Sequence, residues 1–263
     1  MSAIDHYKAG ELNEAIAAAT ADVKAKPTDR GARGFLCELL CFAGDLERAD
    51  KQLDALGQLD PDSLVGVALF RQLIRGEQAR QQFYNEGRVP EFLDQPTPDL
   101  QLHLQASVLI RDGNLAAASR LLDEAEEQRP ALCGELDGRP FSGLRDVDDL
   151  NASFFEVLTS TGKYYWIPMD RVELLEFKPF EHPRDLLWRR AHMIVRNGPD
   201  GEVYLPTLYP GAAAHADPQI RLGRMTQWRG EDSEPVRGSG QRIYLVGEED
   251  IPILELTTLQ FAE

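Results

Sequence analysis

The first 130 residues repeat apolar positions with the period of an α-helix. In residues 43–61, "AGDLERADKQLDALGQLDP", apolar side chains recur every three or four positions between a Gly-Asp turn and a closing Asp-Pro. This spacing predicts an amphipathic helix that buries one face. Similar phrases occur elsewhere in this part of the chain, which raises the question of a repeat.

A repeat of about 34 residues is present. Gly10, Gly44 and Gly113 are each followed by Leu two residues later, Ala five residues later and Pro seventeen residues later. Four prolines of this region are spaced by 34, 35 and 34 residues: Pro27, Pro61, Pro96 and Pro130. This is the tetratricopeptide period, so we predict an array of antiparallel helical hairpins. The third unit is a degenerate copy around Gly76.

We call this repeated Gly-Leu-Ala-Pro spacing the frame, and each residue type in it has a physical role. Glycine supplies the permissive backbone between the two helices of a hairpin, and proline ends the second helix. Ala49 and Ala118, which come five residues after the turn glycine, are expected at tight helix–helix contacts.

The pattern changes near residue 131. Residues 131–160 are turn-rich and acidic, and they predict a connector with a short helix near residues 147–158. From residue 161 onward, aromatic and β-branched runs are separated by turn signals, and "VRNGPDGEV" is typical of a hairpin. The prediction is an α+β chain with a tetratricopeptide-like helical domain at 1–130, a connector at 131–160 and a mostly antiparallel β domain at 161–263.

Composition and charge exclude several classes of protein. The net charge of −16 argues against binding to nucleic acid or to an anionic membrane, because both need a basic face. No apolar run is long enough to cross a bilayer, and the polar N-terminus lacks the features of a secretory signal. Three cysteines without framework spacing suit a reducing compartment, so we expect a cytoplasmic protein.

The candidate chemical motifs favour structural roles. Cys37 and Cys41 lie in the apolar "FLCELLCF" and are expected in the core rather than on a metal, and the histidines, including His192, form no metal-binding pair. "STGKYYW" lacks the first glycine and the hydroxyl residue of a phosphate loop. The acidic run Asp146, Asp148 and Asp149 is either a site for a hard cation or, more commonly, a solvated helix start. We therefore predict no catalytic, cofactor-binding or metal-binding residues.

Arginines next to aromatic residues form the last unexplained pattern. Arg184 precedes "DLLW", and Arg221 and Arg224 occur near Trp228. Two interpretations stay open, an internal arginine–carboxylate network, which we favour, and a polar binding face.

These segments also carry a family resemblance. "DGRPF", "YYWIPMDRV", "RDLLWR", "PTLYPG", "RLGRMTQW" and "GQRIYLV", in this order, resemble the ImpE/TagJ family of type VI secretion accessory proteins, and the resemblance covers essentially the whole chain. It implies a non-enzymatic, virulence-associated component. It also implies binding to an N-terminal helix of the small sheath subunit TssB, and a link to the ATPase ClpV that recycles the sheath. The family has no established catalytic residues to transfer.

A hairpin array offers a concave wall made from the first helix of each unit, which suits capture of another helix. The 34-residue register places on it the following partner-binding candidates: Gly31, Gly34, Glu38, Gln72, Arg75, His103 and Ser107. The alternative is that the β domain of the same chain fills this wall. Two other functions stay open, a peptide-binding scaffold with unrelated partners, and an enzyme whose site combines Arg184, His192, Arg221 and Arg224.

Overall fold

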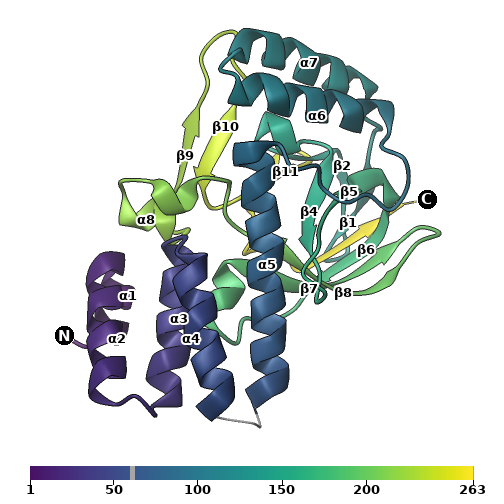
Figure 1. Cartoon of the computed structure of the whole chain (residues 1–263). Coiled ribbons are helices and arrows are strands. Elements are labelled where there is room, and N and C mark those ends of the chain that lie inside the picture. Colours follow the sequence, from purple (N-terminus) through teal and green to yellow (C-terminus); the bar gives the residue numbers. More distant parts are fainter. Residues whose placement is uncertain (60–62, 263) are drawn as a thin grey trace.

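The computed structural model describes residues 1–59 and 63–262, and helices make up its N-terminal half (Figure 1). The helices are α1 (Ala3–Ala9), α2 (Leu12–Ala25), α3 (Arg30–Phe42), α4 (Leu46–Leu59), α5 (Leu64–Glu86), α6 (Pro98–Arg111) and α7 (Leu115–Gln128). Helices α1 to α5 stand side by side, whereas α6 and α7 lie across the far end of α5 (Figure 1). None of the helices in the described part is long and apolar enough to span a bilayer.

The three predicted hairpin turns are confirmed. Gly10, Gly44 and Gly113 lie between paired helices with φ of 85°, 73° and 76°, in the left-handed region that favours glycine. Ala49 on α4 and Ala118 on α7 are completely buried, as the frame requires. Pro61, the closing proline of the second unit, lies outside the described residues.

The expected third hairpin is wrong, because one helix of 23 residues, α5, continues through Gly76. Gly76 is needed there for a close approach to the β domain. A Cβ at this position would lie 3.2 Å from Cδ2 of Leu158. The chain turns later, at Gly87, where φ is 81°. The long helix interrupts the regular array and separates α6 and α7 from α1 to α4.

The C-terminal half is an antiparallel β structure, as predicted. An eight-stranded sheet has the order β2-β1-β13-β6-β7-β8-β4-β5, and all its pairs are antiparallel. Its strands are β1 (Cys133–Leu136), β2 (Arg139–Ser142), β4 (Phe154–Leu158), β5 (Tyr164–Pro168), β6 (Val172–Phe177), β7 (Trp188–Val195), β8 (Asp200–Pro206) and β13 (Thr258–Phe261). Strands β7 and β8 form the predicted hairpin.

Two smaller sheets complete this half. The first has the order β12-β11-β3, and the second pairs β10 with β9. Their strands are β3 (Leu144–Asp146), β9 (Thr226–Arg229), β10 (Arg237–Gly240), β11 (Ile243–Val246) and β12 (Glu249–Pro252). Short helical segments occupy the connections: η2 (Asp149–Asn151), η3 (Met169–Arg171), η4 (Pro183–Leu186), η5 (Ala212–Ala214) and α8 (Pro218–Arg221).

The segment expected to be a connector with a short helix contains strands instead. Residues 133–146 form β1, β2 and β3, and the predicted helix near 147–158 is the single turn η2 followed by β4. Strand β4, "FFEVL", is buried at every position, so its apolar run is that of a fully buried strand. Strand β1 forms a hairpin with β2 across Asp137-Gly138 and pairs on its other side with the last strand of the chain, β13.

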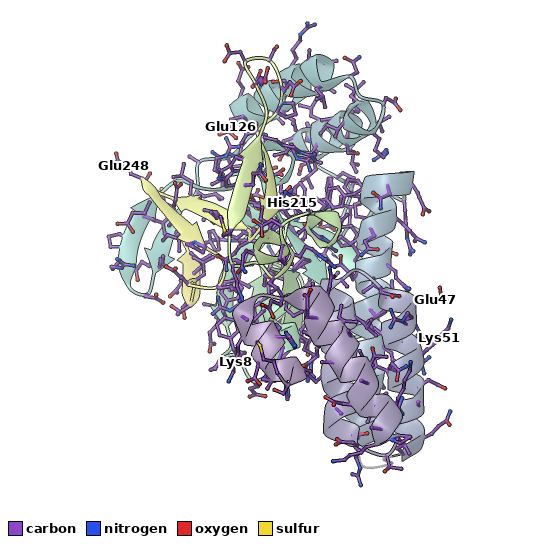
Figure 2. All side chains as sticks on the ribbon, turned by 90° about the vertical axis from the view of Figure 1, so that its left-hand side faces the viewer. Lys8, Glu47, Lys51, Glu126, His215 and Glu248 are labelled. Carbon is purple, nitrogen blue, oxygen red and sulfur yellow. The ribbon has the colours of Figure 1, made fainter. Side chains whose placement is uncertain are left out.

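One apolar cluster joins the helices to the sheet, and a second lies within the β half. The ring of Trp166 in β5 stacks on that of Phe154 in β4, with 3.8 Å between the ring centres. It meets the ring of Phe83 in α5 edge-on, with 4.8 Å between the ring centres. On the other side of the array, Glu47 and Lys51 of α4 point away from the body of the molecule (Figure 2). Helix α5 is therefore the element through which the helical and β halves are packed together.

Candidate functional site

The seven partner-binding candidates do not form one continuous wall. Gly31 and Gly34 lie on the open surface of α3, and a Cβ added to Gly34 would have nothing within 4 Å. Glu38, one turn further along α3, is only 6% exposed. Its carboxylate accepts a hydrogen bond of 3.3 Å from Arg184 of η4. A segment of the β half thus covers this part of the predicted wall.

Gln72 and Arg75 face a different part of the molecule. Both pack beside Gly162, where an added Cβ would lie 2.5 Å from Oε1 of Gln72 and 3.3 Å from Cβ of Arg75. Gly162 is in the β4–β5 turn and has a φ of 80°. These two side chains therefore line the junction with the β half rather than the surface next to Gly34.

The side chains of His103 and Ser107 are buried. The His103 ring is 2.8 Å from the hydroxyl of Ser153 and meets the Phe154 ring edge-on. Ser107 donates a 2.6 Å hydrogen bond to the carbonyl of Leu104 within α6. At His103 the predicted wall is therefore covered by the chain's own β half, whereas the hydrogen-bond partners of Ser107 lie within α6.

The 34-residue register assigned the wrong face of α5 to the predicted wall, and the contacts of Arg184 show which face lies next to α3. Arg184 pairs with Glu38 on one side, and on the other its guanidinium lies 5.2 Å from the centre of the Phe70 ring. Phe70, not Gln72, is therefore the α5 residue opposite Glu38. A shift of two residues turns a helical face by about 200°, which takes the predicted positions away from α3.

One turn before this bridge, both helices carry a glycine. Gly34 precedes Glu38 by four residues, and Gly66 precedes Phe70 by four residues, so each shares a face with its successor. A Cβ on Gly66 would also have nothing within 4 Å. We call this surface, defined by Gly34 and Gly66, the glycine strip.

The arginines and the histidine of the enzyme hypothesis are dispersed. Arg221 donates to the side chain of Asn13, and Arg224 donates to the carbonyls of Tyr7 and Lys8. His192 is 3.0 Å from Asp200 across the β7–β8 hairpin. The arginine contacts, including the Arg184–Glu38 pair, hold the β half against α1, α2 and α3, whereas the His192–Asp200 contact lies within the β7–β8 hairpin.

An internal arginine–carboxylate network is present, but other arginines build it. Arg80 of α5 donates two hydrogen bonds of 2.9 Å to Glu156 of β4. Arg242 bridges Glu156 and Asp146, and Arg237 pairs with Asp148 at 2.9 Å. The signal in the sequence was Glu156 inside the apolar run "FFEVL", because a carboxylate in a buried strand needs a countercharge.

The network explains the acidic run at 146–149, which is neither a cation site nor a solvated helix start. Asp146 and Asp148 are completely buried and paired with arginines. Asp149 pairs with Arg145 at 2.6 Å. Within residues 1–59 and 63–262, no group of three or more His, Cys, Asp or Glu could hold a metal ion. Cys37 and Cys41 are buried and unpaired, and burial raises the pKa of Cys37 to about 12.

Burial and pairing set the ionisation of the network. Burial acts to raise the pKa of Glu156, but Arg80 and Arg242 outweigh it and hold this pKa at about 2. Burial is the main cause that raises the pKa of Glu77, and its neighbour Arg80 opposes it. Glu156 is therefore a permanent anion of the interior, whereas Glu77 is a carboxylate whose charge is poorly compensated.

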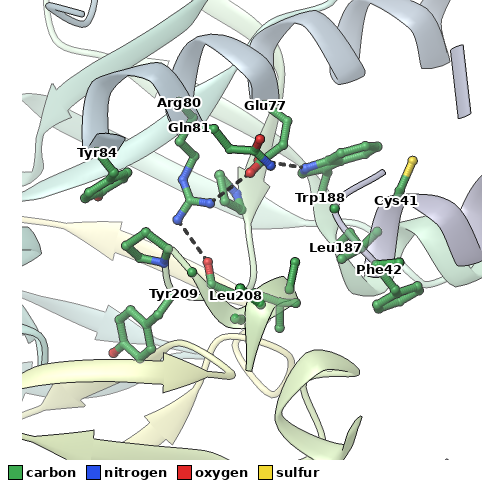
Figure 3. A pocket seen from close by; sticks show the side chains of 18 of the residues that line it. Cys41, Phe42, Glu77, Arg80, Gln81, Tyr84, Leu187, Trp188, Leu208 and Tyr209 are labelled. Atoms are coloured by element: carbon green, nitrogen blue, oxygen red, sulfur yellow. Dashed lines mark hydrogen bonds and ion pairs between the residues drawn. The ribbon is translucent and has the colours of Figure 1, made fainter. Parts of the chain in front are cut away.

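A cavity of about 330 Å³ opens beside the network (Figure 3). The C-terminal end of α3, the middle of α5, the start of β7 and residues 206–214 enclose it. Glu77 accepts a 3.1 Å hydrogen bond from the indole of Trp188 and a 3.3 Å hydrogen bond from Arg80. Arg80 also donates to the carbonyl of Leu208 at 2.9 Å, which closes the cavity floor (Figure 3).

The fold and these surfaces define a class, an array of helical hairpins joined through a buried ion network to an antiparallel β half. The family model for ImpE protein matches residues 138–260. The type VI secretion system accessory component TagJ of Pseudomonas aeruginosa is 31% identical over 261 residues, which is 99% of this chain and 91% of that relative. The chain belongs to the ImpE/TagJ family of type VI secretion accessory proteins.

A solved structure shares the whole architecture. The crystal structure of protein VPA1032 from Vibrio parahaemolyticus has a TM-score of 0.92 to this chain and is 28% identical in sequence. The match covers 99% of this chain and 97% of that one. The interrupted array with its long α5 is thus part of a fold seen in full in a second protein.

Proposed function

We propose that this protein is a non-enzymatic adaptor of a bacterial type VI secretion system that binds the N-terminal helix of the small sheath subunit TssB. In this role it links the sheath subunit to the recycling ATPase ClpV, and it acts in the cytoplasm. Membership of a family of type VI secretion accessory components supports the general role. The particular partners rest on the family resemblance of the sequence.

The glycine strip is the observation that supports a helix-binding surface. Hairpin arrays bind partner helices along the first helices of their units, which here are α3 and α5. Gly34 and Gly66 leave the backbone of both helices open, so an apolar side chain of a partner helix can approach closely. Of the seven predicted residues, Gly31 and Gly34 stay candidates for this contact, and Gly66 joins them.

The structural use of the arginines supports a role without catalysis. Arg184, Arg221 and Arg224 hold the two halves together, and Arg80 and Arg242 are paired with buried carboxylates. A general-purpose scaffold with other partners would use the same surface, so the decisive test is the identity of the partner.

Calorimetric titration of the TssB N-terminal peptide into the full chain tests the proposal. We expect saturable binding to the parent and at least about a tenfold loss in Gly34→Trp and Gly66→Trp, because an indole on either helix would block the strip. Ala17→Trp, on the exposed side of α2, is the matched control and should bind as the parent does. A peptide that does not bind the parent would refute the proposed partner. Equal binding by all variants would move the site away from α3 and α5.

The link to ClpV needs a second measurement. The tagged chain should retain ClpV on beads in the presence of TssB, and the Gly34→Trp variant should retain less. If ClpV is absent from the beads when TssB is bound, the adaptor role is wrong, although sheath binding would stand.

A further inference from the structure

We propose that the cavity between α3, α5 and the segment 206–214 is a binding site for a lysine side chain presented by a partner protein. This site is separate from the glycine strip, so the inference goes beyond the proposed function and does not require TssB to be the partner. It rests on charge, geometry and the chemistry of the cavity wall.

The charge balance of the buried network leaves one carboxylate over. Three guanidinium groups face four carboxylates: Arg80, Arg237 and Arg242 against Glu77, Glu156, Asp146 and Asp148. Arg80 gives its two shortest carboxylate contacts to Glu156, and its contact with Glu77 is longer, at 3.3 Å. Glu77 thus has the longest arginine contact of the four carboxylates. It is also the only acidic side chain among the described residues that line the cavity.

A second negative feature points into the same space. Helix α3 ends at Phe42, and Cys41, Phe42, Ala43 and Gly44 all line the cavity. The C-terminus of a helix carries a partial negative charge of about half an elementary charge. Glu77 and the end of α3 therefore act together on a cation placed between them.

The shape of the cavity suits a long side chain with a charged tip. Its volume of about 330 Å³ is at the lower end of the range for ligand pockets, so it has room for a side chain rather than for a large cofactor. Phe42, Leu187 and Leu208 supply apolar wall for a methylene stem. Burial raises the pKa of Glu77, and a neighbouring cation would favour its charged form.

The hydrogen bonds of Glu77 select lysine over arginine. One carboxylate oxygen already accepts from Trp188 and the other accepts from Arg80. A guanidinium prefers two free carboxylate oxygens for a two-pronged contact, whereas an ammonium needs one approach direction and donates to other acceptors as well. The net charge of −16 further favours approach of a basic segment.

The indole N–H of Trp188 is a direct reporter, because it donates to Glu77. We would titrate the ¹⁵N-labelled full chain with the peptide acetyl-Gly-Lys-Gly-amide and follow the Trp188 indole signal, assigned with Trp188→Phe. The expected result is a saturable shift that the norleucine peptide, with the same stem and no charge, does not produce. The arginine peptide should bind more weakly than the lysine peptide. Equal shifts with norleucine and lysine peptides, or no shift in a folded chain, would overturn the site.

Variants distinguish the site from a general charge effect. Glu77→Gln keeps an oxygen that accepts from Trp188 and should weaken the lysine peptide about tenfold or more. Gln81→Lys places a cation at the cavity wall from a half-exposed helix position and should have the same effect. Glu47→Gln, on the outer side of α4, should change nothing. If Glu77→Gln and Gln81→Lys both bind as the parent does, the proposal is wrong.

A free amine is the other source of the same chemistry. In a parallel titration, n-butylamine presents the lysine side chain without a peptide backbone. A partner side chain predicts tighter binding of the peptide than of the amine. Tighter binding of butylamine would overturn the assignment to a protein partner.

Discussion

Arg80 and Glu156 are 76 positions apart in the chain, and two hydrogen bonds of 2.9 Å join their side chains in the interior. Arg80 belongs to α5 and Glu156 to β4, so this pair ties the helical half to the sheet. Tyr84 and Tyr164 add hydroxyl hydrogen bonds to the same carboxylate. A buried carboxylate with this many donors is stable only while its partners remain in place.

Removal of one member of this pair is expected to be costly. Arg80→Met should lower the free energy of unfolding by about 3–5 kcal/mol, because it leaves a buried carboxylate short of positive charge. Arg71→Met is the matched control on the same helix. Its ion pairs with Asp50 and Asp54 are near the surface, so the loss should be about 1 kcal/mol or less. Urea unfolding of both variants gives the comparison, and similar losses would contradict a special role of the buried pair.

The two glycines of α5 should respond in opposite directions to the same substitution. Gly76→Leu should destabilise by about 1–3 kcal/mol, because Leu158 already occupies the space that the side chain needs. Gly66→Leu should stabilise by about 0.5–1 kcal/mol, since an open helical position gains from a better helix former. Thermal unfolding measures both changes. Stabilisation by Gly76→Leu would show that α5 and β4 are not in close contact.

The parts of the fold that could be predicted are those with local signals. Gly10, Gly44 and Gly113 each combine a turn with a fixed spacing to alanine and proline, so the hairpins were found. The interruption at α5 was missed because Gly76 resembles a turn glycine in sequence, whereas its role depends on Leu158, a residue of a distant strand. Strand β1 was missed although it has a local signal, because Asp137-Gly138 forms the two-residue turn of the β1–β2 hairpin.

The candidate site was harder to predict because helical faces depend on register. The 34-residue register put Gln72 and Arg75 on the same wall as Glu38, whereas the structure places them beside Gly162 in the β4–β5 turn. Arg184 covers Glu38, although the two residues are 146 positions apart in the chain. No local sequence pattern indicates such a contact. Gly34 has open space at its Cβ position, and its role in partner binding stays a prediction.

The alanines of the hairpin frame provide a test of helix packing. Ala49→Leu and Ala118→Leu should each destabilise by about 1–3 kcal/mol, because both positions are completely buried and have no room for the longer side chain. Ala17→Leu, on the exposed face of α2, should stay within about 0.5 kcal/mol of the parent. Chemical denaturation of the three variants separates these outcomes. Unchanged stability in the two buried variants would mean that the frame alanines are not at helix contacts.

Glu38 should make stability depend on pH. Burial raises its pKa from 4.5 to about 7, although Arg184 opposes the shift. Between about pH 4.5 and pH 7, the folded chain therefore keeps a proton on Glu38 that the unfolded chain has released. The folded state binds more protons in this window, so the contribution of Glu38 to the free energy of unfolding falls as pH rises. At about 1.4 kcal/mol per pKa unit, the loss across the window is about 2–3 kcal/mol.

Glu38→Gln removes this titration while keeping a polar side chain next to Arg184. The variant should gain stability relative to the parent as pH rises from about 5 to 7, and the difference should level off above that. Urea unfolding at several pH values measures the difference directly. His103, whose pKa is lowered to about 4 mainly by burial, titrates in both proteins and therefore cancels. Glu47→Gln, an exposed position, should run parallel to the parent. If the difference between Glu38→Gln and the parent stays constant over this range, Glu38 is not held in its neutral form by burial.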